Sequence, residues 1–567
     1  MGAIALFDWI VIVVYLLGIT GLGLWASKKV HSSTSLFIGD RQFGKWMMTF
    51  HSFGTGTHSD QAVGVAAKAY TTGASGIWYQ WLWLFVTPFY WLIAPIFRRM
   101  RAVTVGEYFE VRYGSSVAVL FAAVGMLQLM FSIGLMLKGS SAMIGAISGG
   151  QINPELAIGA MTIMFVTYGV VGGLSAAIIT DFVQGVMTIV LSFLLLPFAL
   201  DAVGGLQGLR TSIEDPTFFE LVAPGEIGVF FVAVIAFNAL IGWGCQPTSM
   251  GMCAAGKSEM EGRVGVTAGV LIKRVCTIAW VLTGLCAVAL YKGQTLDVDH
   301  VYGQMAHDLF PIIGPGLIGL FLASMLASVM SSCDSLMIAS SALFTQNIYR
   351  KLIAPEQSET HFLWVGRIAS FGIVLVGVLF AFSIENVVSG LETFWKLAAM
   401  MGVAFWIGLF WRRATPAGAW AGTLVSFATL LLAGQIEWLG WDFDAQFAHH
   451  LPGFMLWEGK LYLPWQMIMY LTTGLIAFIM VSLKTAPMAS ESLDRFYACL
   501  RTPIQPWETE TTAFTLPEGL APEPRRSLVD HPDFEIPRPS MIGMLGFFGA
   551  WIAVGVLMAS FIWLLKA

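Results

Sequence analysis

A row of serines crosses an otherwise apolar stretch, Phe321–Tyr349. Four of them recur at steps of four, three and four residues, which places their hydroxyls on one face of a helix. These four are Ser324, Ser328, Ser331 and Ser335, and Ser332 and Asp334 flank them. A hard cation prefers hydroxyl and carboxylate oxygens as ligands, and a carboxylate inside an apolar helix is costly and usually functional. The spacing alone therefore leaves two readings open, a cation site and a small-residue seam for close helix packing.

Two other stretches carry polar residues where a helix is predicted to be interrupted. SFGTGTHSDQAVG contains Gly54 and Gly56, and NALIGWGCQPTSMG contains Gly242, Gly244 and Pro247. Glycine frees the backbone and proline removes a donor, so each interruption can turn carbonyls toward a cation or a solute. Interrupted segments that open two successive five-helix sets of opposite direction indicate a binding site at the middle of a transporter. Kinks that serve packing alone are the alternative.

The composition indicates the setting in which these residues act. Of 567 residues, 57% are hydrophobic and only 11% are charged, whereas soluble domains carry about 25% charged residues. We expect an all-α polytopic membrane protein. The 6 cysteines form no Cys-x-x-Cys pair, so neither a disulfide framework nor a zinc site is expected. There is no basic domain that would indicate nucleic-acid binding.

Hydropathy predicts about 14 transmembrane helices. They are expected at 7–26, 46–70, 76–97, 116–146, 154–174, 177–200, 227–250, 263–291, 315–347, 361–384, 390–411, 416–436, 463–484 and 541–566. A short interfacial helix is expected within 98–114. Most of the 30 Lys and Arg residues then fall on one side, which predicts a plasma-membrane protein with both termini outside.

The spans suggest a division of the chain into six parts. They are an N-terminal helix and loop (1–45), a first five-helix repeat (46–200), an outer loop with a second inverted repeat (201–411), two additional helices (412–484), a proline-rich cytoplasmic loop (485–540) and a C-terminal helix (541–567). The proline content predicts that 485–540 is irregular rather than a second folded domain.

Four stretches resemble the sodium/solute symporter family, which includes the sodium/glucose and sodium/proline cotransporters. They are GLFLASMLASVMSSCDSLMIASSALFTQNIY at 319–349, GGLSAAIITDFVQG at 172–185, PIFRRMRAVTVGEYFEVRYG at 95–114 and GLFWRRATPAGAWAG at 408–422. Their order matches the family over about 30–450. The resemblance implies a leucine-transporter-type fold of two inverted five-helix repeats.

The resemblance also implies a sodium ion between the first and eighth core helices. Its ligands would be the backbone carbonyls of Gly54, Thr57 and Ser328 and the hydroxyls of Ser331 and Ser332. A second sodium site of some family members would fall on Asp181, Ser331, Asp334 and Ser335. Because two close carboxylates more often share a proton or an arginine, we expect one sodium per cycle and no other metal.

The solute site is expected along the interrupted helices and their neighbours. The candidate residues are Gln61, Gln80, Asn238, Trp243, Gln246 and Lys273. Lys273 lies inside its span and is expected either to contact the solute or to form a salt bridge with Asp60 or Glu392. Tyr79 and Trp81 are expected to stack on a sugar or to enclose the cavity. His51 and His58 are expected to be hydrogen-bonded fillers, with a solute contact open to His58.

Some positions depart from the sugar-type pattern. Gly242 stands where sugar transporters commonly have tyrosine, Leu391 replaces an expected glutamine, and the pair Gln246 and Pro247 looks more like the proline-type members. We therefore predict a sodium-coupled symporter, not an enzyme, that imports a small polar solute by alternating access. A sugar or polyol is favoured, with an amino acid or carboxylate as the alternative and a transporter-fold sensor less favoured. The expected partners are the solute, sodium and the bilayer, without an obligatory protein partner.

Overall fold

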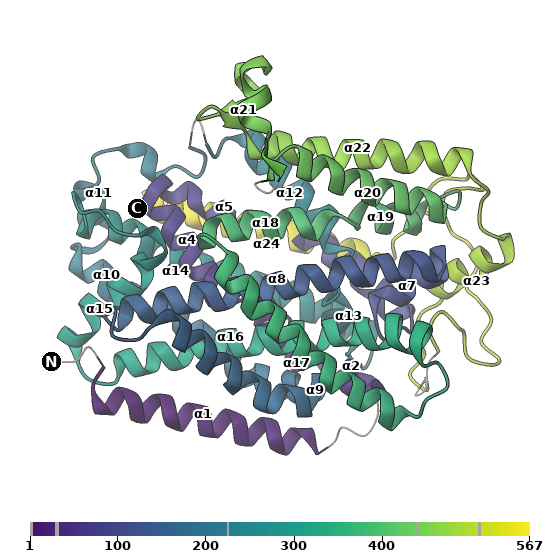
Figure 1. The fold of residues 1–567 in the computed structure, drawn as a ribbon, viewed down its shortest axis with the longest axis horizontal. Coiled ribbons are helices and arrows are strands. Elements are labelled where there is room, and N and C mark those ends of the chain that lie inside the picture. The colour runs from purple at the N-terminus through teal and green to yellow at the C-terminus, as the bar shows by residue number, and fades with distance from the viewer. Residues whose placement is uncertain (1–3, 29–32, 224–225, 437–438, 509–511, 567) are drawn as a thin grey trace.

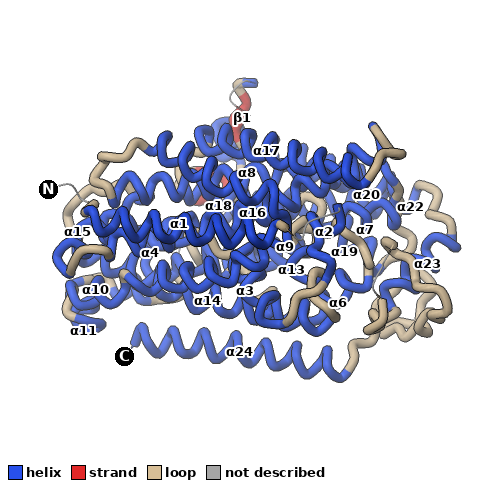
Figure 2. The backbone as a smooth tube through the Cα atoms, turned by 90° about the horizontal axis from the view of Figure 1, so that it is seen from below, coloured by secondary structure: helices blue, strands red, loops and turns tan. Residues whose placement is uncertain are grey.

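The computed structural model describes residues 4–28, 33–223, 226–436, 439–508 and 512–566. The chain folds into a long bundle of helices (Figures 1 and 2). The first half contains α1 (Leu6–Ser27), α2 (Ser33–Ile38), α3 (Lys45–Gly56), α4 (Ser59–Thr72), α5 (Trp78–Trp81), α6 (Thr87–Arg99), α7 (Val105–Tyr113), α8 (Ser115–Ile147), α9 (Pro154–Leu194), α10 (Leu196–Ala202) and α11 (Gly205–Ser212).

The second half begins with α12 (Val229–Trp243), α13 (Ser249–Ala254), α14 (Glu259–Leu290), α15 (Val301–Ile313), α16 (Leu317–Ala342) with a π-helical extension (Leu343–Ile353), α17 (Glu359–Ser383), α18 (Val387–Ala399), α19 (Gly402–Phe410) and α20 (Pro416–Leu432). It ends with α21 (Phe443–Phe447), α22 (Leu463–Lys484), α23 (Ser490–Arg501) and α24 (Met541–Lys566). Two small antiparallel pairs, β1 (Gln435–Ile436) with β2 (Trp441–Asp442) and β3 (Leu456–Trp457) with β4 (Lys460–Leu461), lie in the connection that projects around α21 (Figure 1).

Among the described residues, nine helices are long and apolar enough to cross a membrane. Three shorter apolar helices, Pro154–Thr167, Val229–Trp243 and Pro416–Leu432, accompany them. The predicted number of about fourteen spans is higher than this count of long apolar helices. Several predicted spans are split into two shorter helices, as in α3–α4 and α12–α13, and a short helix does not enter the count. Gly173 kinks α9 with φ of +57°, which divides it near the boundary predicted between two spans.

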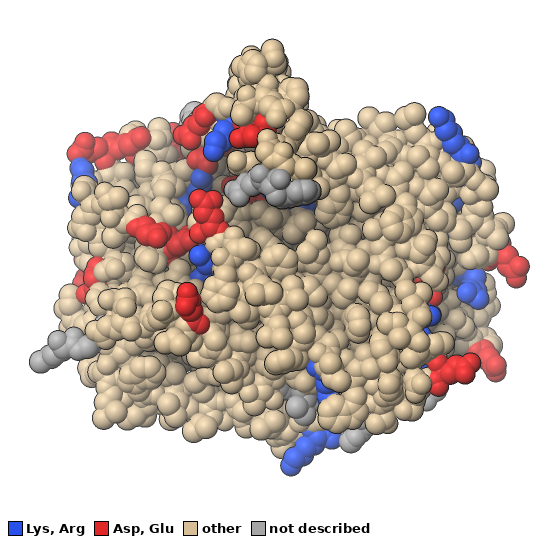
Figure 3. Space-filling model, viewed as in Figure 1, with Lys and Arg blue, Asp and Glu red and all other residues tan. Residues whose placement is uncertain are grey.

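The outer surface suits a bilayer. Most of the face drawn in Figure 3 carries no charged side chain. Large apolar side chains project outward from the peripheral helices, including Leu17 of α1, Leu379 of α17 and Leu545 of α24. Because lipid does not penalise exposed apolar surface, these faces need no further cover. The polar residues of the core are therefore the unusual ones, and they gather around the interrupted helices.

The helices nearest the interruptions pack as two groups. α14 lies against α3, α4 and α6, and α13 packs on α6 and α14. α16 packs on α8 and α9, and α17 packs on α8. The interrupted helix α3 also contacts α9 and α16, so it lies between the two groups. The predicted interfacial helix is α7, which Thr104 and Glu107 cap reciprocally at its first turn.

Candidate functional site

The first helix interruption is two residues long. α3 ends at Gly56, Thr57 and His58 are extended with φ of −129° and −141°, and α4 begins at Ser59. Carbonyls at the end of α3 therefore lose the regular partners that a continuing helix would provide. The interruption lies where the glycines predicted it.

Gly54 allows α3 to approach α16 closely. A Cβ at this position would collide with Oγ of Ser331 and come within 3.4 Å of the Asp181 carboxyl carbon. A larger residue would therefore force α3 away from α16. Close approach of these two helices is what brings their oxygen atoms together.

Two hydroxyls of the serine row meet two carbonyls of the interruption. Ser332 Oγ donates to Gly54 O at 2.7 Å, and Ser328 Oγ donates to Thr57 O at 3.2 Å. Ser332 Oγ also lies 3.5 Å from Thr57 O, and all four residues are buried. A hydroxyl can rotate to present a lone pair, so these oxygens offer the hard ligands that a sodium ion needs.

Ser331, predicted for the same set, donates its hydroxyl to Asp181 Oδ1. On the other side of that carboxylate, His51 Nδ1 lies 2.6 Å from Oδ2. Thr55 Oγ1 lies 3.4 Å from His51 Nδ1 and donates to Ser335 Oγ at 3.0 Å. The network links α3, α9 and α16, and it contains three of the four residues predicted for a second sodium site.

Asp334, the fourth of those residues, faces the first half of α9. A Cβ on Gly169 would lie 2.5 Å from its Oδ1. In the described part of the chain, the carboxylate oxygens of Asp181 bond to His51 and Ser331 instead. Three of the four predicted residues thus form this network, Asp334 lies against α9, and the second sodium site stays a prediction.

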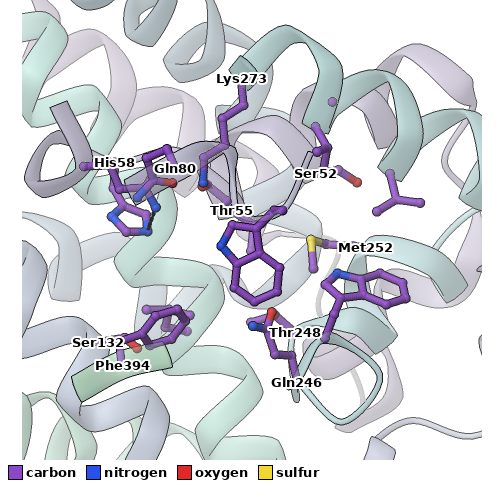
Figure 4. Close-up of a pocket in the computed structure, with 18 of the residues that line it drawn as sticks. Ser52, Thr55, His58, Gln80, Ser132, Gln246, Thr248, Met252, Lys273 and Phe394 are labelled. Atoms are coloured by element: carbon purple, nitrogen blue, oxygen red, sulfur yellow. Dashed lines mark hydrogen bonds between the residues drawn. The ribbon is translucent and has the colours of Figure 1, made fainter. Parts of the chain in front are cut away.

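A cavity of about 950 Å³, counting its open mouth, lies beside the interruption. It contains five of the six residues predicted to bind the solute, namely Gln61, Gln80, Trp243, Gln246 and Lys273. Lys273, Gln80 and His58 lie together on one side, while Gln246 and Thr248 lie on another (Figure 4). Polar side chains from both interrupted helices thus share one space.

Asn238 is the predicted residue that is not part of the cavity wall. Its amide donates to Trp395 O at 3.0 Å, and its Oδ1 accepts from the Tyr470 hydroxyl. These bonds join α12 to α18 and α22. In this structure the polar atoms of Asn238 are used between helices, so its contact with the solute stays a prediction that the cavity wall does not support.

Lys273 reaches the cavity without either of its predicted salt bridges. Its ammonium group donates to Gly56 O. Glu392, one predicted partner, accepts a hydrogen bond from Tyr79 at 2.7 Å, and Asp60, the other, is paired with His58. The Lys273 ammonium group and the Gly56 carbonyl at the end of α3 thus meet at the cavity wall.

Several cavity amides retain hydrogen-bonding capacity. His58 Nε2 lies 2.8 Å from Gln61 Nε2, whereas the side-chain oxygens of Gln61 and Gln80 have no partner among the described residues. Buried polar groups are normally satisfied, so such acceptors favour a ligand that carries donors. Hydroxyl, amide and ammonium groups would all qualify.

Aromatic side chains enclose the cavity. Trp243 and Trp395 line the cavity; Trp243 packs against Tyr90 with ring centroids 4.3 Å apart, and Trp395 lies 5.0 Å from Tyr79. Tyr79 and Trp81, which were expected to enclose the cavity, are not part of its wall: Tyr79 packs behind Trp395, and the Trp81 indole donates to Arg274 O while its ring packs on Phe561 of α24. Sequence reasoning missed Tyr90 and Trp395, which have no spacing that separates them from other core aromatics.

The fold defines a helical polytopic membrane transporter, in which buried oxygen atoms of α3 and α16 lie beside a polar cavity. The model of the sodium:solute symporter family matches residues 36–426, and the chain belongs to this family. It is therefore a sodium-coupled solute symporter, in a family of transporters rather than enzymes.

Relatives with different cargo match to similar extents. The high-affinity proline transporter PutP of Bacillus subtilis (strain 168) is 25% identical over 441 residues, covering 72% of this chain and 89% of its own. Sodium/myo-inositol cotransporter 2 of Mus musculus is 24% identical, covering 76% and 69%. The sodium/glucose cotransporter of Vibrio parahaemolyticus is 22% identical, covering 74% and 83%. These relatives do not favour a sugar over an amino acid.

Solved structures support the fold. A sodium-coupled sialic acid symporter in a substrate-bound outward-open state aligns with a TM-score of 0.71 at 20% identity, covering 85% of this chain and 99% of its own. The nucleobase-cation-symport-1 family transporter Mhp1 aligns with a TM-score of 0.51 at 12% identity, covering 81% and 97%. At these identities the likeness concerns the fold alone.

Proposed function

We propose that this symporter imports a small polar organic solute through the cavity by alternating access. The observation that supports this proposal is that one helix interruption serves both sites. Gly54 and Thr57 turn their carbonyls toward the serines of α16, while Gly56 and His58 line the cavity. Sodium binding would fix the backbone that forms one wall of the solute site, which couples the two ligands.

Two classes of solute suit the cavity. Amide oxygens beside aromatic rings favour a sugar or polyol, whose hydroxyls donate to Gln61 and Gln80 while its apolar face packs on Trp243. The ammonium group of Lys273 favours a solute with a carboxylate, such as an amino acid. Both classes belong in the first solute screen.

We further propose one sodium ion per cycle, bound at the predicted set of Gly54, Thr57, Ser328, Ser331 and Ser332, with the hydroxyl of Ser328 facing the interruption where its carbonyl was expected. Support comes from His51, which occupies one side of the Asp181 carboxylate where a second ion would otherwise bind. The expected setting is the plasma membrane with both termini outside, as the distribution of Lys and Arg predicts.

The test is uptake into proteoliposomes that contain the purified full-length chain. The panel includes proline, myo-inositol, glucose and sialic acid, each offered with an inward sodium gradient and with a matched potassium gradient. We expect one class to accumulate only with sodium, and the Ser328→Ala/Ser332→Ala protein to lose that accumulation at low sodium. Accumulation that is equal in sodium and potassium would contradict the proposal.

A further inference from the structure

The described parts of 485–540, a stretch expected to be an irregular loop, dock against one end of the helix bundle. The described parts of this segment, 485–508 and 512–540, are called the strap here. It contains α23, which packs on α6 and α7. Figures 1 and 2 both place α23 and the neighbouring loops at the end of the molecule beside α7. The strap buries Phe496, Cys499 and Phe514 completely.

The strap has a first anchor at the end of α6. Arg101 Nε lies 2.7 Å and Nη2 2.8 Å from the two carboxylate oxygens of Glu508, and neither side chain is exposed. Phe514 donates its N–H to Met100 O at 2.8 Å, and its ring stacks on Phe496. A two-pronged, buried ion pair is specific in geometry. This anchor holds the strap to one defined place on the bundle.

A second anchor lies at the end of α19. Arg412 Nη1 donates to Glu535 at 2.8 Å, and Arg412 also pairs with Asp494. The backbone adds two bonds, from Arg412 N–H to Asp533 O at 2.7 Å and from Glu535 N–H to Phe410 O at 2.8 Å. Because Arg501 of the strap also reaches Glu535, the two anchors are linked through α23.

The strap also reaches α14. Arg99, the last residue of α6, forms a two-pronged pair with Glu259 at 2.7 and 2.8 Å. Ile504 of the strap donates its N–H to the same Glu259 carboxylate at 3.2 Å. α14 packs on α3, whose terminal carbonyls face the serines of α16, and α6 packs on α14. The strap therefore connects this helix group with α7 and α19.

A smaller cavity lies next to the main one. The two share Thr55 and Thr248 in their walls, and the smaller one is also lined by Val103 and Thr104. These two residues lie two and three positions after Arg101, which binds Glu508 of the strap. The wall of the smaller cavity is therefore continuous in the chain with the segment that the strap holds.

We propose that the strap keeps this end of the transport path closed and that Glu508 releases Arg101 when the path opens. In this structure the sodium-site oxygens of α3 and α16 are in contact while both anchors are formed. This step rests on the proposed function: sodium bound to those oxygens stabilises the closed arrangement. A solute that leaves the cavity at the end of the bundle covered by the strap can do so only after the buried ion pairs of the strap have broken. This requirement is additional to the helix movements of the transport cycle.

The rate at which Cys499 reacts with a maleimide measures how often the strap leaves the bundle. Cys499 is fully buried, with Sγ 3.2 Å from Arg99 O and 3.3 Å from Arg101 Nη1. The other five cysteines, to be replaced by alanine, are Cys245, Cys253, Cys276, Cys286 and Cys333. The full-length protein is then labelled in detergent with a hydrophilic maleimide, in sodium chloride or in potassium chloride. The assay requires no solute, so its result does not depend on the identity of the cargo.

Three variants, two in the strap and one at its partner Arg101, are compared with the unsubstituted protein. Glu508→Gln removes the charge of the first anchor, and Glu518→Gln removes an exposed charge of the same strap. We expect Glu508→Gln to label Cys499 about tenfold faster or more than Glu518→Gln, since labelling follows the open population. Arg101→Lys keeps the charge but loses the two-pronged geometry, and an intermediate rate is expected.

The unsubstituted strap provides a second readout. Labelling of Cys499 is expected to be slower in sodium than in potassium, and Glu508→Gln is expected to narrow that difference. Equal labelling of Glu508→Gln and Glu518→Gln would overturn the proposal, and so would a sodium-independent rate for the unsubstituted strap. If Glu508→Gln does not fold, Arg101→Lys measured against Glu518→Gln decides by the same criterion.

Discussion

His51 Nδ1 lies 2.6 Å from Asp181 Oδ2, and both side chains are buried. The opposite oxygen of the carboxylate accepts from Ser331, a residue of the serine row. An acid that the family resemblance assigns to a second cation is thus bound by a histidine of the interrupted helix. A buried carboxylate needs such partners, and the histidine supplies one without a metal ion.

The first prediction is the number of charges moved per solute. With the Asp181 carboxylate bound by His51, we expect one charge per neutral solute, measured as the reversal potential of solute-coupled current. One sodium moving through about 100 mV and a roughly tenfold gradient supports roughly several-hundred-fold accumulation. A ratio near two would show that a second ion is carried. Asp181→Asn should then return that ratio to one.

The second prediction concerns the sodium ligands. Ser328→Ala with Ser332→Ala removes two hydroxyls that contact the carbonyls of Gly54 and Thr57. The half-saturating sodium concentration should rise about tenfold or more, equivalent to about 1.4 kcal/mol. Ser341→Ala is the matched control, because its hydroxyl donates only to Ile338 O of its own helix among the described bonds. Unchanged sodium dependence in the double variant would remove these serines from the site.

Helical spacing and backbone-breaking residues predicted much of this arrangement. The spacing of the serines predicted which face of α16 carries hydroxyls, and Gly54 and Gly56 predicted where α3 ends. Spacing and backbone-breaking residues are local properties of the sequence, so they can be read without the fold. The bond between His51 and Asp181 joins residues 130 positions apart. Spacing tells which residues share a face but not which faces meet, so this contact was not predictable.

The same limit explains two differences between expectation and structure. Asn238 was expected in the cavity because it lies on an interrupted helix, but a buried amide can equally bond between helices, as it does to Trp395 and Tyr470. The prolines of 485–540 predicted an irregular loop, and the structure adds that α23 and Phe514 of this stretch are buried against the bundle. Composition reports chain stiffness and hydration, whereas docking depends on complementary groups such as Arg101 elsewhere in the chain.

The third prediction separates the solute contacts from interhelical bonds. Gln246→Ala should weaken solute affinity by about fivefold to tenfold, equivalent to about 1 kcal/mol for one lost hydrogen bond. Asn238→Ala should leave solute affinity near its original value and lower the unfolding temperature, since it removes two buried bonds. Binding measured by competition, with thermal unfolding measured in parallel, checks both. The reverse pattern would place the solute next to Asn238.

The fourth prediction identifies the charge type of the solute. Lys273→Met removes the ammonium group from the cavity wall and leaves a side chain of similar length. If the cargo carries a carboxylate, its affinity should fall about tenfold or more, since a charge-assisted hydrogen bond contributes about 1.5–3 kcal/mol. A neutral sugar or polyol should lose less, within about fivefold. Sodium affinity measured without solute is the control and should change little, because the proposed sodium ligands, at the end of α3 and on α16, do not include Lys273.

The last prediction concerns acid sensitivity of the strap. Burial opposes ionisation of Glu508, but hydrogen bonds from Arg101 and the Gln505 backbone outweigh it and hold the Glu508 pKa below its ordinary value of 4.5. A depressed folded-state pKa contributes stability that is complete above the unfolded value and is lost as pH falls toward the folded value. Glu508→Gln should therefore lower the unfolding temperature by roughly a few degrees at pH 7. That difference should stay constant down to about pH 5 and shrink below about pH 4. A difference that grows on acidification would show that Glu508 is not held as a carboxylate by Arg101.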